Sequence, residues 1–183
     1  MSDLKLTDLQ MQVKHHLREI PNYPKEGILF YDITTILDNA SCLHNIIDFW
    51  KMRYERECIT HIVGIESRGF TFGSALAYAL GVGFVPVRKK GKLPYKTYAQ
   101  EYTLEYGVDT LEIHVDAFKN QADERARVVL VDDLLATGGT AAASIELIKR
   151  AGGDCVEACF LIRLAELGGE KKLATRYMNI LDV

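Results

Sequence analysis

Two adjacent acids and a glycine-rich turn are the residues of this sequence most suited to chemistry. Residues 128–131 read VVLV, an apolar run typical of a strand covered on both faces. Asp132 and Asp133 follow directly, and residues 137–140 read TGGT just before a predicted helix. Glycines let the backbone wrap closely around an anion, and a helix start offers unpaired N–H groups. The segment therefore predicts a phosphate-binding loop beside two carboxylates.

The two carboxylates restrict the ligand that this loop can hold. A carboxylate beside a phosphate is unfavourable unless the ligand separates the two groups or brings a cation. A sugar phosphate fits, because its hydroxyls can meet the acids while its phosphate meets the loop and the hydroxyls of Thr137 and Thr140. The alternative is an acidic strand end followed by an ordinary turn.

Two common nucleotide motifs are absent from these segments. The Walker A pattern needs a lysine after its second glycine, and none follows Gly139. Gly64 and Gly69 have the Walker spacing, but Phe70 follows in place of lysine. The dinucleotide fingerprint G-x-G-x-x-G is also absent here.

Two further segments are suited to binding anions. Residues 64–69 read GIESRG, and they lie between a predicted strand and a predicted helix. Residues 88–92 read RKKGK, with four cations in five residues, after another predicted strand. A solvated basic turn or a targeting patch is the alternative for this second segment. Its place after a sheet strand, near two other anion sites, favours pyrophosphate binding.

The elements that must position these residues alternate along the chain. Apolar runs predict strands at residues 61–65, 82–87, 128–131 and 155–162, and helical spacing predicts helices at about 7–19, 40–56, 70–80 and 141–151. Such alternation favours an α/β fold with a central, mostly parallel sheet flanked by helices. Residues 94–113, rich in tyrosine, are expected to form a long mobile hairpin or loop outside the sheet.

Length and composition limit the classes of protein. A chain of 183 residues suits a single domain. Its net charge of −3 argues against a general nucleic-acid-binding surface. Neither a secretory signal nor a membrane-spanning run is apparent. The four cysteines include no C-x-x-C pair and are expected to be buried free thiols, so the expected location is the cytoplasm.

The segment VVLVDDLLATGGTAA, residues 128–142, resembles the motif with which type I phosphoribosyltransferases bind 5-phosphoribosyl-1-pyrophosphate. The resemblance implies the fold of that family. It also implies that Asp132 and Asp133 contact the ribose hydroxyls. The loop that holds the 5′-phosphate would consist of Ala136, Thr137, Gly138, Gly139 and Thr140.

The resemblance covers almost the whole chain and favours the adenine-specific branch of the family. The segments that carry it are EGILFYDI at 26–33, IVGIESRGF at 62–70, GVGFVPVRKKGKLP at 81–94 and LEYG at 104–107. It implies adenine and the phosphoribosyl donor as substrates, AMP and pyrophosphate as products, Mg2+ as cofactor and a homodimer. Mg2+ would be held mainly through the substrate, with no side-chain ligand assigned.

The resemblance also assigns the pyrophosphate and the base. The pyrophosphate ligands would be Glu66, Ser67, Arg68, Arg88, Lys89 and Lys92. Phe30 would stack on the purine, although its spacing alone would make it a core residue. Backbone groups of Leu29 and Tyr31 would read the edge of the purine, and Leu164 would cover its other face.

The reaction implied is displacement of pyrophosphate at the anomeric carbon by a purine nitrogen. Glu105 on the hairpin matches the acid that would accept or share the proton of the base, and Glu101 is a second candidate. Tyr106 would close over the reacting groups, and Arg68 would neutralise the leaving group.

Three positions depart from the family pattern. Tyr95 follows Pro94, where glycine is usual, which bears on the conformation of the hairpin. Arg163 replaces an acid before Leu164, and residues 168–170 read GGE where the family usually has Gly-Arg. The last two changes bear on the base pocket, and none of the three touches the phosphate or acid motifs.

Two other functions stay open at this point. One is a non-catalytic regulator with the same fold, which binds the donor or a nucleotide as a signal. Arg68, Lys92 and Glu105 favour catalysis over this reading. The other is a sister enzyme that acts on hypoxanthine, guanine or xanthine.

Overall fold

The computed structural model of this protein describes residues 6–104, 107–119 and 125–183. Its main feature is a seven-stranded sheet with the order β5-β6-β4-β3-β7-β8-β9. Five strands run parallel: β4 (Gly83–Lys89), β3 (His61–Ile65), β7 (Ala126–Leu135), β8 (Gly153–Arg163) and β9 (Arg176–Asp182). This confirms the predicted α/β fold with a mostly parallel sheet.

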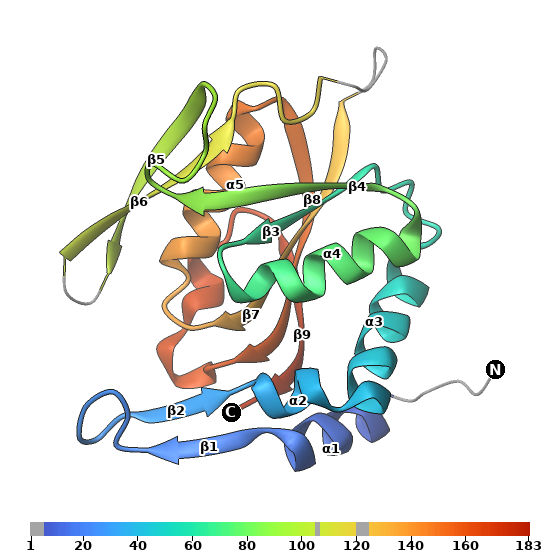
Figure 1. The fold of residues 1–183 in the computed structure, drawn as a ribbon, viewed down its shortest axis with the longest axis vertical. Coiled ribbons are helices and arrows are strands. Elements are labelled where there is room, and N and C mark those ends of the chain that lie inside the picture. The colour runs from blue at the N-terminus through green and yellow to red at the C-terminus, as the bar shows by residue number, and fades with distance from the viewer. Residues whose placement is uncertain (1–5, 105–106, 120–124) are drawn as a thin grey trace.

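Helices cover both faces of the sheet (Figure 1). On one face, Val129 and Val131 of β7 belong to a core that also contains residues of α3 (Ala40–Tyr54) and α4 (Arg68–Leu80). On the other face, Val128 and Leu130 join a core with α5 (Gly139–Arg150). Side chains alternate between the faces of a strand, so a wholly apolar run is buried on both sides. In the part of the chain that the structure describes, no helix is long and apolar enough to cross a bilayer.

The N-terminal region differs from its prediction. The helix expected to continue to about residue 19 ends earlier, as α1 (Leu6–His16). The chain then enters β1 (Arg18–Pro21), which pairs antiparallel with β2 (Leu29–Asp32). An ion pair of 3.2 Å between Arg18 and Asp32 links the two strands. A short helix, α2 (Thr34–Asp38), and strand β9 were not predicted, because their apolar runs are short.

Strand β7 is longer than the sequence indicated. It was expected to end at the two acids, but it continues through them to Leu135, because Asp132 still pairs with Phe160 and Leu135 with Arg163 on β8. The acids are therefore held by the sheet ladder and not by a loop.

The tyrosine-rich segment forms the antiparallel hairpin β5 (Thr97–Leu104) and β6 (Gly107–His114). It was expected outside the sheet, but its base belongs to the sheet through two antiparallel pairs between β6 and β4, one of them Lys89↔Leu111. Arg150 of α5 also donates a hydrogen bond to the Ala99 carbonyl of β5 at 2.7 Å.

The cysteines are free, as expected, but their burial differs from the prediction. Cys42 and Cys159 are buried, whereas Cys155 is partly buried and Cys58 is exposed.

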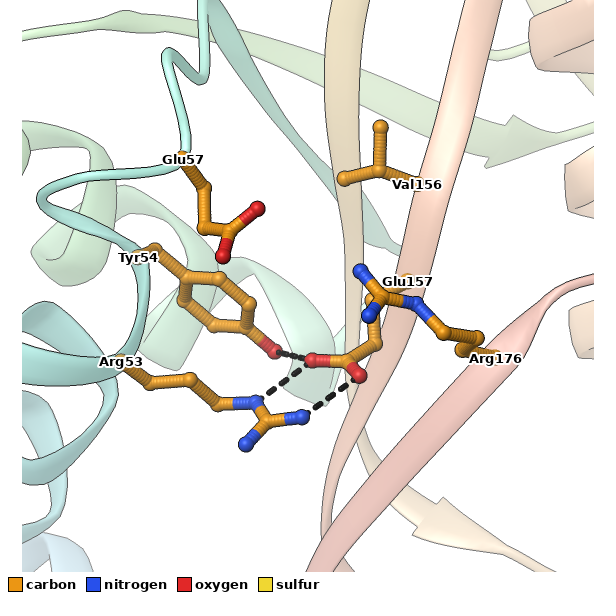
Figure 2. Close-up of a pocket in the computed structure, with 6 residues that line it drawn as sticks. All are labelled: Arg53, Tyr54, Glu57, Val156, Glu157 and Arg176. Atoms are coloured by element: carbon orange, nitrogen blue, oxygen red, sulfur yellow. Dashed lines mark hydrogen bonds and ion pairs between the residues drawn. The ribbon is translucent and has the colours of Figure 1, made fainter.

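A pocket in the amino half of β8 contains a fully paired carboxylate (Figure 2). Glu157 is 2% exposed and accepts hydrogen bonds from Arg53 Nε at 2.6 Å, Arg53 Nη2 at 2.7 Å and the Tyr54 hydroxyl at 2.8 Å. Both partners lie in the last turn of α3. The network therefore ties α3 to the sheet.

Candidate active site

The predicted phosphate loop forms the turn between β7 and α5. Gly138 has a left-handed φ of +77° and immediately precedes the first residue of α5. A side chain would be strained there. Most of the predicted loop residues line one small pocket of about 70 Å³, together with Asp132: they are Ala136, Thr137, Gly138 and Thr140. The free N–H groups at the start of α5 suit an anion in this pocket.

The two acids have different neighbours, although both lie near the start of α4. Asp132 lines the pocket of the phosphate loop, and its Oδ1 also lies close to Gly69 of α4, 2.9 Å from where a Cβ atom on that glycine would be. Asp133 lies on the side of α4, where it is 3% exposed and its Oδ2 is 3.1 Å from Nε of Arg68.

The positive charge beside the two buried acids is too small to stabilise both of them in the ionised form. Burial raises the pKa of Asp133, and the Arg68 guanidinium only partly opposes this effect. Burial, and then the charge of Asp133, raise the pKa of Asp132 well above its ordinary value. Two carboxylates thus share one guanidinium, so a ligand that donates hydrogen bonds would stabilise their charged forms.

Arg68 connects three of the predicted subsites. It begins α4 directly after the loop predicted to bind pyrophosphate, and it pairs with Asp133. Its guanidinium carbon also lies 5.7 Å from the ring centroid of Phe30. One side chain therefore contacts the acid pair and the predicted base platform.

Phe30 is partly exposed on β2, so it is not the core residue that its spacing alone would suggest. Tyr23 packs edge-on against it, with ring centroids 5.2 Å apart. Sequence reasoning missed Tyr23, which lies in the turn before β2 and has no distinctive spacing. Leu29 is exposed, and Tyr31 is partly buried on the same strand.

The remaining predicted pyrophosphate residues surround Glu66. Its carboxylate accepts two hydrogen bonds of 3.2 Å from Arg88 and one of 3.0 Å from the Lys89 amide. The hydrogen bonds from Arg88 hold the pKa of Glu66 below its ordinary value. Arg88 also donates to the Lys92 carbonyl at 3.0 Å. Glu66 thus connects the loop of residues 64–69 to the basic segment of residues 88–92. The next residue, Ser67, precedes α4, and the Glu66–Ser67 peptide is cis.

The hairpin lies against the phosphate loop. A Cβ atom on Gly139 would be 3.2 Å from the Thr103 carbonyl oxygen and 3.5 Å from Cδ2 of Tyr102. The Tyr102 hydroxyl donates to Asp109 at 3.2 Å, and Asp109 is 3.6 Å from the Lys89 ammonium. Tyr102 was not among the predicted site residues.

Of the three remaining predicted site residues, the structure describes only Leu164. Glu105 and Tyr106 lie outside the described residues. Leu164 directly follows β8 and is partly buried, and its amide donates to the Leu135 carbonyl at 2.9 Å.

Comparisons with known proteins agree with this geometry. The phosphoribosyl transferase domain family matches residues 32–182. The adenine phosphoribosyltransferase of Helicobacter hepaticus is 55% identical over 94% of this chain and 97% of its own length. That of Helicobacter pylori strain Shi470 is 58% identical over 92% and 93%.

A solved structure is similar over nearly the same span. The adenine phosphoribosyltransferase of Saccharomyces cerevisiae, complexed with an imino-altritol bisphosphate and adenine, has a TM-score of 0.88 at 41% identity. The match covers 96% of this chain and 99% of the yeast chain. The chain therefore belongs to the adenine phosphoribosyltransferase family.

Proposed function

We propose that this protein transfers the 5-phosphoribosyl group of 5-phosphoribosyl-1-pyrophosphate to adenine, with AMP and pyrophosphate as products, and so serves purine salvage. The observation that carries the proposal is the position of Arg68. Its guanidinium lies between the buried acid Asp133 and the ring of Phe30, and Arg68 directly follows the loop predicted to bind pyrophosphate. A donor with a sugar and two anionic ends, bound beside a separate purine, matches this order of groups.

In this proposal the phosphate loop holds the 5′-phosphate, and the acids accept hydrogen bonds from the ribose hydroxyls. The raised pKa values of Asp132 and Asp133 support this role, because hydroxyl donors offset the cost of burying charged carboxylates. Ser67, Arg68, Lys89 and Lys92 bind pyrophosphate. Glu66 is ionised and bonded to Arg88, so its role is to position that arginine and not to contact the anion.

The base lies on Phe30 with its edge against the backbone of Leu29 and Tyr31, and Leu164 covers its other face. Displacement of pyrophosphate builds positive charge on the anomeric carbon, and the nearby carboxylates stabilise it. Arg68 neutralises the charge that develops on the leaving group. Glu105 accepts the proton of the base, and Tyr106 covers the reacting groups, which excludes water.

Mg2+ is the proposed cofactor, and the acid pair fits it. Mg2+ is usually held by one or two carboxylates together with substrate phosphates. The described residues offer Asp132 and Asp133 but no group of three or more ligating side chains. When bound, the ion would supply charge neutralisation at the pyrophosphate.

We also propose a cytoplasmic homodimer. The exposed side chains of Met52 on α3 and Tyr78 on α4, 44% and 91% exposed, support burial against a second copy. The exposed free thiol of Cys58 suits a reducing compartment. Light scattering at working concentration tests the dimer, and a monomer would contradict it.

Product formation from adenine, the donor and Mg2+ tests the function, with hypoxanthine and guanine in parallel. We expect AMP and pyrophosphate from adenine alone. Turnover with another base only would overturn the assignment of the base pocket. Tight donor binding without turnover of any base would favour the regulator.

A further inference from the structure

The phosphate loop rests on a second backbone segment, main chain against main chain. A Cβ atom on Gly138 would overlap the carbonyl of Gly169, and a Cβ atom on Gly169 would overlap the carbonyl of Ala136. The same Cβ on Gly169 would lie 2.7 Å from the Gly138 nitrogen. Gly169 is buried and begins the short 3-10 helix η2 (Gly169–Lys172). The loop therefore depends on the position of η2.

A partly buried ion pair holds η2. The Glu170 carboxylate is 3.6 Å from Nη1 of Arg163, and the two side chains are 19% and 20% exposed. Among the described residues, Glu170 Oε2 has no hydrogen-bond partner, so its charge is balanced mainly by this guanidinium. Arg163 is in turn fixed to β9, because its Nε donates to Asp182 at 2.7 Å and its Nη1 to the Tyr177 hydroxyl at 3.1 Å.

The two members of this pair are the two departures from the family pattern near the C-terminus. Arg163 stands where an acid is usual, and residues 168–170 read GGE where Gly-Arg is usual. The structure shows the two in contact. The two departures therefore meet in one ion pair.

We propose that the Arg163–Glu170 pair is a positioning device for the phosphate loop and sets the affinity of the site for the 5′-phosphate. The proposal rests on the proposed function of that loop. Neither side chain needs to touch the substrate. Glu170 locates η2, the Gly169 backbone supports Ala136 and Gly138, and a small displacement of the loop weakens every N–H contact with the phosphate.

The test compares Glu170→Gln with Asp182→Asn. Each variant removes one carboxylate partner of Arg163. Only Glu170 belongs to η2, whose first residue, Gly169, packs against the phosphate loop. The probes are ribose 5-phosphate and inorganic pyrophosphate, titrated by calorimetry with Mg2+ present, followed by KM for donor and adenine.

We expect Glu170→Gln to weaken ribose 5-phosphate binding about three- to tenfold, the size of coupling seen between contacting groups. KM for the donor should rise by the same factor. Pyrophosphate affinity and KM for adenine should stay at the wild-type values, and Asp182→Asn should change none of the four.

A rescue experiment separates positioning from general loss of structure. Glu170→Arg places like charges together and should weaken ribose 5-phosphate binding more than Glu170→Gln does. Adding Arg163→Glu in an Asp182→Asn background restores opposite charges and should recover most of that affinity.

Unchanged ribose 5-phosphate binding by Glu170→Gln would overturn the proposal, as would equal weakening of both probes or failure of the rescue. If the wild type bound pyrophosphate but not ribose 5-phosphate, the assignment of the loop itself would fail.

Discussion

Two carboxylates of the same sheet are almost equally buried but differently compensated. Glu157 on β8 and Asp133 on β7 are 2% and 3% exposed. Burial works to raise the pKa of Glu157, but hydrogen bonds from Arg53 and Tyr54 outweigh it and hold the pKa below its ordinary value. Asp133 has one guanidinium at 3.1 Å and a second acid beside it, and burial keeps its pKa raised.

The difference separates a structural charge from a functional one. The protein completes the hydrogen bonding of Glu157 itself, so nothing is left for a ligand (Figure 2). At the carboxyl end of β7 compensation is incomplete, and this is where ligands bind in open α/β sheets. Ionisable groups left in such a state mark functional sites more often than structural ones.

The largest expected effect is that of Asp133→Asn on catalysis. Loss of one member of a buried, hydrogen-bonded charge pair costs about 2–5 kcal/mol in binding, so kcat/KM should fall on the order of 100-fold or more. Steady-state kinetics and calorimetric titration of the donor measure it. Asp154→Asn, an exposed acid at the other end of the sheet, is the control. If Asp133→Asn bound the donor with wild-type affinity, Asp133 would have no role in donor binding and the contrast with Glu157 would fail.

The counterpart is Arg53→Ala, which should affect stability and not catalysis. It leaves Glu157 buried without its main partner, and an unpaired buried polar group costs about 1–3 kcal/mol, with the exposure of Arg53 and the remaining Tyr54 hydrogen bond keeping the loss in that range. Urea denaturation should show this loss, while KM for both substrates stays unchanged. Arg56→Ala, at an exposed arginine of the same region, should stay within about 0.5 kcal/mol of the wild type. A rise in KM for Arg53→Ala alone would mean that the two regions are coupled.

The same contrast explains what could be predicted from the sequence. The acid pair and the phosphate loop lie within one contiguous segment, so their types and spacing were sufficient. Glu157 and Arg53 are 104 positions apart, and each is unremarkable in its own segment. Gly169 and Gly138 meet only after β8 and η2 are in place. Strand β1 was missed because its pairing with β2 outweighs the helical pattern that precedes it.

A smaller effect is expected for Phe30→Leu at the base platform. Stacking of a base on an aromatic ring contributes about 1–3 kcal/mol, so KM for adenine should rise at least about fivefold. KM for the donor should change little. Tyr23→Leu, which removes only the edge contact with Phe30, should have a weaker effect in the same direction. An unchanged KM for adenine in Phe30→Leu would place the base elsewhere.

The smallest and most diagnostic effect is on the pH dependence of stability. The native acid pair has raised pKa values, so above the ordinary value of 3.8 it keeps protons that the unfolded chain has lost. The free energy of unfolding therefore falls as pH rises through this window. Asp133→Asn removes the free-energy cost of ionising a buried carboxylate. The variant should therefore be more stable than the wild type near neutral pH, by about 1 kcal/mol, and this gain should fade toward pH 4.

Glu157→Gln should show the opposite sign. The pKa of Glu157 is lowered, so its contribution is fully present above the ordinary value of 4.5 and is lost as pH falls through the native pKa. The variant should be less stable than the wild type at neutral pH, and the deficit should shrink below pH 4.5. Urea denaturation of both variants between about pH 4 and 7 measures the two differences. Differences of the same sign would mean that the protein compensates both carboxylates alike, and that the acids of β7 are not held in readiness for a ligand.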